Sequence, residues 1–170
     1  MKLAQANEAG VEPVVTRDRL TMVVFSGEFD RWMAAFTLAT SGAAMGAEVT
    51  MYFTFWGVLG LRKKRRLRGK SLLDRMFTLM LPKGSGATTR LNFGGLGACL
   101  FGFAMKKKHV ASLDELVELA RDLGVRMIVC EMSMDVTGIG ADELVDGVEY
   151  GGAASCVLEL TKSGTSPLFI

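Results

Sequence analysis

The sequence predicts an α/β protein in which a parallel sheet lies between two layers of helices. The prediction rests on buried strand patterns, at residues 20–25 and 126–130, that alternate with helical patterns along the chain. Crossovers between parallel strands are right-handed, so a flavodoxin-like three-layer α/β/α sandwich is the economical arrangement. At 170 residues, the chain is long enough for one domain with its own core.

The N-terminal part predicts a strand, a helix and a second strand. Residues 20–25 form the first buried strand, and residues 26–30 turn into a helix that runs to about Met45. The apolar positions of this helix recur at helical spacing: Trp32, Ala35, Phe36 and Ala39. The second strand is expected from Glu48 to Phe55, where alternation gives way to aromatic residues.

The middle of the chain predicts helices around a glycine-rich loop. A pattern similar to a capping box begins a helix at Ser71, and that helix ends before Pro82. Residues 82–98 predict a loop, and residues 99–107 predict a short apolar helix.

The C-terminal part continues the alternation. A capping box begins a helix at Ser112, and Gly124 terminates it. The strand over residues 126–130 follows at once, and a loop is expected to lead from it into a helix. Residues 151–162 predict the last main helix, and residues 168–170 predict a terminal strand.

Composition limits the classes of function. Hydrophobic residues make up 49% of the chain, which excludes general disorder, and a net charge of +2 is too small to predict nucleic-acid binding. Three cysteines without close pairing fit a reducing cytoplasm. Residues 1–18 lack the apolar core of a signal peptide and predict a flexible extension to a single domain over residues 19–170. The longest uncharged runs fall short of the ~18–20 residues of a spanning helix.

Cys130 is the main candidate for chemistry because it closes the strand over residues 126–130. Ligands and reactive groups of open α/β sheets collect beyond the carboxyl ends of strands. N–H groups at the start of a helix favour the thiolate, which is the nucleophilic form. The alternative is a buried structural cysteine. Glu131 and Asp135 flank Cys130, and because their charges would oppose a thiolate, we expect them to cap the following helix or bind a partner.

Other residues give weaker indications of a site. His109 is the only histidine, and no Cys/His cluster exists, so no metal site is predicted. A structural or surface role for His109 is favoured over a dyad with Cys130. The glycines in mid-chain do not follow the first strand, so close packing or an active-site loop is favoured over nucleotide binding. These glycines are Gly94, Gly95 and Gly97.

A basic run, Arg62–Arg68, directly follows the apolar residues 55–61. This combination predicts either a segment that lies on an anionic membrane surface or a solvated segment, and the second is favoured. No recognisable module for stacking RNA bases accompanies it. Cys99 lies in an apolar setting and is expected to be structural or pocket-lining, and Cys156 is expected to lie in the core on the last helix.

Several motifs are distributed over about residues 20–170. The most specific is Cys130-Glu131-Met132-Ser133-Met134-Asp135, followed by Gly138-Ile139. The other segments are Thr54-Phe55-Trp56-Gly57, Leu81-Pro82-Lys83-Gly84, Asn92-Phe93-Gly94-Gly95-Leu96-Gly97, Met105-Lys106-Lys107-Lys108, Ser112-Leu113-Asp114-Glu115-Leu116 and Leu168-Phe169-Ile170. Together they resemble the DsrE/DsrF-like family of sulfur carriers and sulfurtransferases, in the branch often labelled "peroxiredoxin family protein". No Pro-x-x-x-[Thr/Ser]-x-x-Cys peroxidatic motif surrounds a cysteine, so peroxidase chemistry is not predicted.

The resemblance implies an α/β/α fold, a trimer-based homo-oligomer and one active cysteine, without a cofactor. Cys130 would carry sulfur as a persulfide between donor and acceptor proteins, as a carrier or sulfurtransferase. Such exchange is governed by access and by thiol pKa. Two other classes stay open: a non-catalytic, membrane-peripheral adaptor and a small-molecule or nucleotide binder in the same cleft.

The site hypothesis places further residues around Cys130. Backbone N–H groups of residues 132–135 would stabilise its charge, the mid-chain glycines would shape the pocket, and Phe55 and Trp56 would wall the adjacent edge. The substrate-binding candidates are therefore Met132, Ser133, Gly94, Gly95, Gly97, Phe55 and Trp56.

Overall fold

The computed structural model describes residues 18–63, 111–162 and 164–170. The strands are β1 (Arg19–Val24), β2 (Glu48–Phe53), β3 (Arg126–Cys130), β4 (Glu149–Gly151) and β5 (Thr165–Phe169). The helices are α1 (Phe29–Ala44), α4 (Leu113–Asp122), α5 (Glu131–Thr137) and α6 (Ala153–Leu160), with 3₁₀ turns η1 (Phe55–Leu61) and η3 (Ala141–Glu143). The helices and the loop predicted over residues 71–107 lie outside the described residues. The same is true of residues 1–17 in the predicted N-terminal extension.

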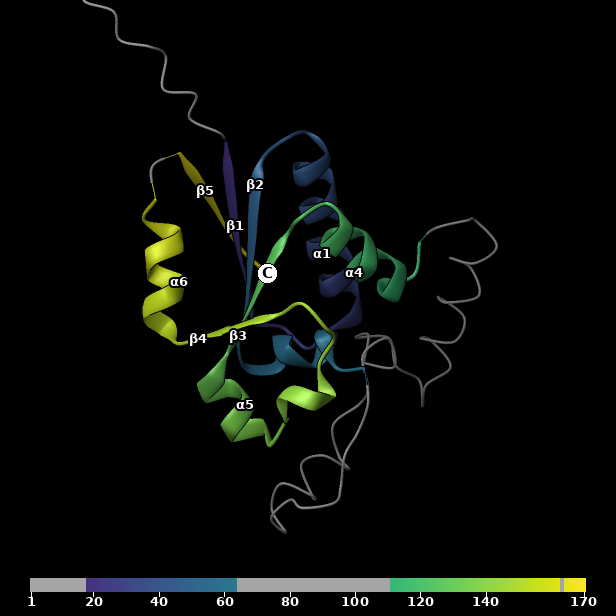
Figure 1. Ribbon diagram of the computed structural model, residues 1–170, viewed down its shortest axis with the longest axis vertical. Coiled ribbons are helices and arrows are strands. Elements are labelled where there is room, and N and C mark those ends of the chain that lie inside the picture. The colour runs from purple at the N-terminus through teal and green to yellow at the C-terminus, as the bar shows by residue number, and fades with distance from the viewer. Residues whose placement is uncertain (1–17, 64–110, 163) are drawn as a thin grey trace, which may run out of the picture.

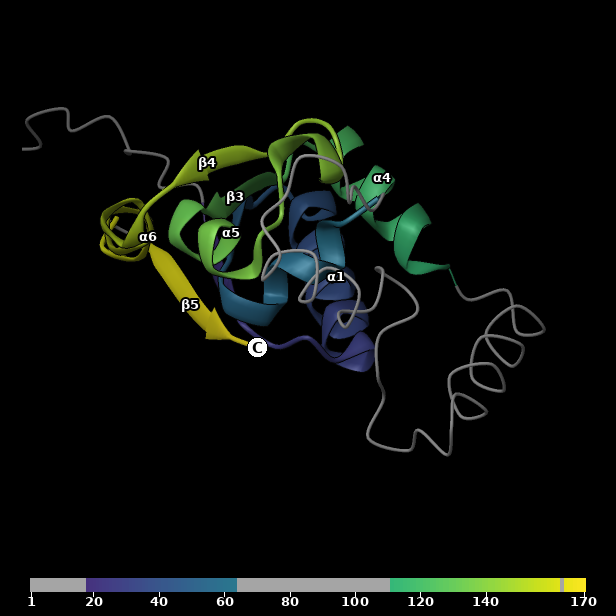
Figure 2. The ribbon, with the colours of Figure 1, turned by 90° about the horizontal axis from the view of Figure 1, so that it is seen from below.

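The five described strands form one parallel sheet in the order β4-β3-β2-β1-β5. Helices α1 and α4 cover one face and α6 covers the other, which confirms the predicted three-layer α/β/α sandwich (Figure 1). Flavodoxin itself orders its strands 2-1-3-4-5, so the strand order differs within the same layered class. At the carboxyl edge of the sheet, η1 and α5 pack together (Figure 2).

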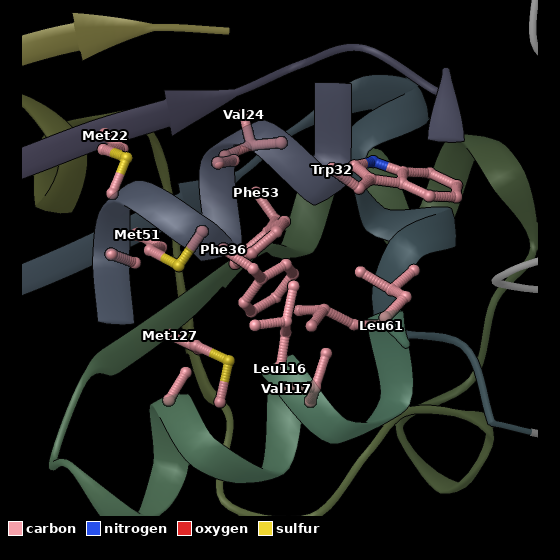
Figure 3. Packing of buried hydrophobic residues seen from close by; sticks show 14 of the residues in the cluster. Met22, Val24, Trp32, Phe36, Met51, Phe53, Leu61, Leu116, Val117 and Met127 are labelled. Atoms are coloured by element: carbon pink, nitrogen blue, oxygen red, sulfur yellow. The ribbon is translucent and has the colours of Figure 1, made fainter. Parts of the chain in front are cut away.

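The sheet buries different side chains on its two faces because successive residues of a strand point to opposite sides. One face carries a large apolar cluster that packs against α1 and α4 (Figure 3). Its central members are Met22, Val24, Trp32, Phe36, Met51, Phe53, Leu61, Leu116, Val117 and Met127. The opposite face carries a smaller buried cluster of Val23, Tyr52, Ile128, Cys130 and Cys156.

The predicted boundaries of α4 are confirmed by its cap. The Ser112 hydroxyl accepts a hydrogen bond from the Glu115 N–H at 3.3 Å, and the Glu115 carboxylate accepts one from the Ser112 N–H at 2.7 Å. This reciprocal pair satisfies two N–H groups at the start of the helix. Gly124 has a φ of 76°, the left-handed conformation that ends helices.

Strand β2 ends at Phe53, two residues before the predicted end. The chain turns at Thr54 and Phe55 into η1, and Phe55 itself has a positive φ of 46°. Gly57 brings the η1 backbone against β1, where a Cβ atom would collide with the Val24 carbonyl oxygen. The aromatic and apolar residues after Phe53 therefore belong to a compact turn over the sheet edge, and not to the strand.

The C-terminal prediction was wrong in two places. Residues 149–151 form β4, where only a helix from residue 151 was predicted, and that helix begins at Ala153. A strand of three residues is too short to show a period of two. Strand β5 begins at Thr165 and contains Pro167, which is tolerated because β5 is an edge strand.

Candidate functional site

Cys130 is the last residue of β3, and α5 begins at the next residue, Glu131. The predicted loop between strand and helix does not exist, because Cys130 occupies the N-cap position itself. Its side chain is buried, with 2% of the residue exposed. The two carboxylates that flank it, Glu131 and Asp135, are both exposed on α5.

Ser133, in the first turn of α5, links the Cys130 sulfur to the end of β2. The Ser133 hydroxyl accepts a hydrogen bond from the Phe55 N–H at 2.8 Å. It also lies 3.1 Å from the Thr54 hydroxyl, and either of these two groups can donate. Ser133, Thr54 and Phe55 therefore join the strained turn after β2 to the first turn of α5, which directly follows Cys130.

The surroundings of the Cys130 sulfur favour its charged form. Burial raises the pKa of the Cys130 thiol, but four hydrogen-bond donors outweigh burial and hold the pKa below its ordinary value. The donor groups are the Ser133 hydroxyl, the Tyr52 hydroxyl, the Ser133 N–H and the Thr54 hydroxyl. Each hydroxyl has one proton, so the one of Ser133 and Thr54 that donates to the other does not donate to the sulfur at the same time. A lowered pKa increases the fraction of thiolate, which is the nucleophilic form.

Tyr52 and Cys156 lie in the same buried cluster as Cys130, on the face covered by α6. The Tyr52 hydroxyl has no oxygen or nitrogen partner among the described residues, and the Cys130 sulfur is its neighbour. Burial, followed by the interaction with Cys130, raises the pKa of Tyr52 well above its ordinary value. The phenol therefore keeps its proton and serves as a donor.

A small apolar cavity of about 80 Å³ lies next to the thiol site. It brings together four of the predicted site residues: Phe55, Trp56, Met132 and Ser133. Val136 and Thr137 complete its lining. The other three candidates, Gly94, Gly95 and Gly97, lie outside the described residues, as do Cys99 and His109.

Sequence reasoning missed Tyr52 and Thr54 as parts of the site. Tyr52 lies on the same face of the sheet as Cys130, one residue before the end of β2. Its position on the strand adjacent to β3 is a signal that strand alternation could have provided. Thr54 directly precedes Phe55 and Trp56 in the sequence. Because those two residues were predicted to line the pocket, Thr54 was a neighbouring candidate.

The structure corrects the interpretation of Arg62 as part of a solvated or membrane-facing basic run. Arg62 is 3% exposed, and its guanidinium lies 2.5 Å from the carboxylate of Glu143, which is fully buried. Lys63, the next residue, pairs with Asp146 at 2.7 Å on the surface. Arg62 is therefore a structural residue, and the remainder of the run lies outside the described residues.

The described residues offer neither a metal site nor a membrane-spanning helix. Residues 18–63, 111–162 and 164–170 contain no group of three metal-binding side chains that could hold an ion. Over the same ranges, no helix combines the length and the apolar character needed to cross a membrane.

The fold and the site together define a class of protein: a three-layer α/β sandwich with a buried, activated cysteine at the carboxyl end of its third strand. The sequence profile of the DsrE/DsrF/DrsH-like family matches residues 16–169. The chain therefore belongs to this family.

Individual relatives agree with this assignment. The uncharacterized protein YrkE of Bacillus subtilis (strain 168) is 38% identical over 155 residues, which cover 89% of this chain and 96% of that protein. The sulfur carrier protein DsrE2 of Allochromatium vinosum is 34% identical over 150 residues, which cover 81% and 89%. The crystal structure of the ychN protein from E. coli matches with a TM-score of 0.52 at 14% identity, over 90% of this chain and 99% of that one, and this likeness shows the fold alone.

Proposed function

We propose that this protein traffics sulfur: Cys130 accepts sulfane sulfur as a persulfide and passes it to an acceptor thiol. The observation that carries the proposal is the set of donors around the Cys130 sulfur, which favours a thiolate at the carboxyl end of β3. Family membership and the similarity to a protein named as a sulfur carrier support a role in sulfur trafficking.

Both steps of this function are thiolate attacks on sulfur. In loading, the Cys130 thiolate attacks the outer sulfur of a donor persulfide, R–S–SH. A bond forms between Cys130 Sγ and that sulfur, the donor S–S bond breaks, and the donor leaves as a thiolate. In unloading, an acceptor thiolate attacks the same outer sulfur and Cys130 leaves. A lowered pKa of Cys130 assists both steps, because it supplies the attacking thiolate and makes a good leaving group.

The surface around the site supports protein partners as donor and acceptor. Cys130 is only 2% exposed, so a donor must approach through the surface formed by α5 and η1. That surface exposes four large apolar residues by 47–67%: Phe55, Trp56, Met132 and Val136. Aromatic and methionine side chains are enriched where proteins bind one another.

Intact-protein mass spectrometry after incubation with glutathione persulfide tests the proposal. We expect the wild type to gain the mass of one sulfur atom, and reductant to remove it. Cys130→Ser should abolish the gain, whereas Cys99→Ser and Cys156→Ser should retain it. Sulfur loading of Cys130→Ser to the level of the wild type would contradict the assignment.

A further inference from the structure

A second buried thiol lies beside the proposed sulfur-carrying cysteine. Cys130 and Cys156 share one cluster of five buried residues with Val23, Tyr52 and Ile128. Both are free cysteines, and they are 2% and 8% exposed. The shared cluster and the electrostatic effect of Cys130 on Cys156 place the two thiols near each other inside the fold.

The topology explains how residues far apart in sequence come together. Cys130 pairs with Gly151 across the β3–β4 ladder, and α6 begins two residues after Gly151. Gly151 lies between the first turn of α6 and β3: a Cβ at this position would lie 2.8 Å from the Ser155 hydroxyl and 3.3 Å from Ile128. Cys156 follows Ser155 and is one of two residues of α6 that are buried. Cys156 of α6 and Cys130 of β3 thereby share one buried cluster. Figure 2 shows α6 directly after β4 in the chain.

We propose that Cys156 is a resolving thiol that converts the Cys130 persulfide into an intramolecular disulfide and releases sulfide. This inference rests on the proposed function, because it needs a sulfur atom on Cys130. The sequence predicted only a structural role for Cys156. As a resolving thiol, Cys156 would let the protein release the sulfur of Cys130 as sulfide when no acceptor thiol binds.

The reaction balances without an external oxidant. Cys156 Sγ attacks Cys130 Sγ, a bond forms between the two cysteine sulfurs, and the bond from Cys130 to the outer sulfur breaks. The outer sulfur leaves with the bonding electrons and takes up the Cys156 proton, so Cys130–S–SH and Cys156–SH give the disulfide and hydrogen sulfide. The sulfane sulfur is reduced, and the two cysteines are oxidised.

The surroundings of Cys156 make this discharge slow relative to delivery. Burial, followed by the proximity of Cys130, raises the pKa of the Cys156 thiol above its ordinary value. Thiol exchange proceeds through the thiolate, so a thiol that keeps its proton attacks rarely. Tyr52 also keeps its proton and does not act as a base toward Cys156. An acceptor protein that presents a thiolate therefore competes effectively for the outer sulfur.

The test follows a loaded protein over time without oxygen. A Cys99→Ser background leaves only Cys130 and Cys156, and glutathione persulfide is removed after loading. We expect the species with one extra sulfur to decay into a species two hydrogen masses below the reduced protein, with one equivalent of hydrogen sulfide. Peptide mapping should join Cys130 to Cys156. Adding Cys156→Ser should preserve the loaded species and produce no sulfide.

The outcomes separate this inference from the proposed function. A protein that never gains sulfur contradicts the proposed function. If Cys130 loads but the loaded species lasts as long as it does in the Cys156→Ser variant, the resolving role is contradicted. The proposed function is not affected by that result. Diamide, a thiol oxidant, provides a second measurement that needs no loading: failure to form a Cys130–Cys156 disulfide in the folded, unloaded wild type overturns the resolving role, even where the variants fold poorly.

Discussion

Ser133 is the residue that connects the backbone around the site to its chemistry. Its hydroxyl accepts from the Phe55 N–H, lies beside the Thr54 hydroxyl and, with the Ser133 N–H, lowers the pKa of Cys130. Phe55 holds a positive φ of 46°, a conformation that costs a non-glycine residue about 1–3 kcal/mol. One side chain thus stabilises both a strained turn and a thiolate.

Replacing Ser133 by alanine should change both properties. Without the hydroxyl, the pKa of Cys130 should rise, so the rate of alkylation by iodoacetamide should reach half its maximum at a higher pH. The Phe55 N–H would lose its acceptor, and the free energy of unfolding should fall by about 1–3 kcal/mol. Ser41→Ala serves as the control, because the Ser41 hydroxyl bonds only within α1, to the Thr37 carbonyl. An unchanged pH profile in Ser133→Ala would show that Ser133 has no part in activating the thiol.

At the scale of residues, the sequence predicted the cysteine and the residues around its cavity, but not the buried residues beneath it. Cys130, Met132, Ser133, Phe55 and Trp56 were predicted from a motif and a strand end, and the structure brings them together. The role of Tyr52 and the position of Cys156 beside Cys130 were not predicted, because they depend on register and on how α6 crosses the sheet. Such contacts between distant segments leave no local pattern in one sequence.

Among the elements, the connection between η1 and the segment before β4 depends on a buried ion pair. The Arg62 guanidinium and the Glu143 carboxylate are both fully buried, and backbone hydrogen bonds join Lys63 to Glu143 and Val145 to Leu61, each at 2.9 Å. η1 also carries Phe55 and Trp56, so this connection holds one wall of the site in place. The basic run therefore begins with a residue that supports the fold.

Replacing Glu143 by alanine should leave the Arg62 charge buried without its carboxylate. Removing one partner of a buried ion pair costs about 3–5 kcal/mol, so the free energy of unfolding in urea should fall by that amount. Asp146→Ala is the control. It removes the exposed partner of Lys63, and exposed pairs contribute about 0–1 kcal/mol. Equal losses in the two variants would refute the structural role assigned to Arg62.

Elements with long periodic patterns were the ones predicted well. The spacing of Trp32, Phe36 and Ala39 predicted α1, and the cap at Ser112 predicted the start of α4. The second strand was predicted two residues too long because Thr54 and Phe55 continue its apolar and aromatic run, and η1 itself was not predicted, although the close approach at Gly57 buries it. Short elements whose burial is decided by packing elsewhere cannot be recognised from local sequence.

The whole molecule exposes apolar side chains on the side of the sheet that α6 covers. Leu168 packs against the α1 cluster, so its neighbour in β5, Phe169, points to the opposite side and is 66% exposed. Val157 and Leu158 of α6 are more than half exposed as well. Adjacent apolar groups of this kind mark surfaces that bind another protein.

We predict a homo-oligomer, with a trimer or a multiple of it preferred from the resemblance to the family. Phe53, Leu59 and Leu61 lie in the core, so the exposed side chains of Phe55 and Trp56 and those of α6 and β5 support this prediction. Light scattering at micromolar concentration should give a multiple of the chain mass. Leu158→Glu should lower that mass, and Leu119→Glu on α4 should not. A stable wild-type monomer would refute the prediction.

The basic run also has a predicted consequence for the whole molecule, although Arg62 no longer contributes to it. Leu59 is 2% exposed and cannot anchor the protein in a membrane interface, whereas Trp56 is 47% exposed and can. The other basic residues of the run after Lys63 are Lys64, Arg65, Arg66 and Arg68, which lie outside the described residues. We expect these four residues to govern a weak, salt-dependent attraction to anionic surfaces.

Co-sedimentation with anionic liposomes measures this attraction. Each basic residue near such a surface contributes about 1 kcal/mol, so replacing all four by glutamine should lower the binding free energy by up to ~4 kcal/mol at low salt. At physiological salt, the Debye length is ~8 Å, so charges farther than that from the lipid surface should contribute little. The difference in liposome binding between the wild type and the variant should then largely vanish. Replacing Lys106, Lys107 and Lys108 is the control for net charge. If the wild-type protein stays in the supernatant, the basic run is merely solvated. If the variant with the four replacements loses sulfur loading on Cys130, the basic run belongs to the surface where the sulfur donor docks.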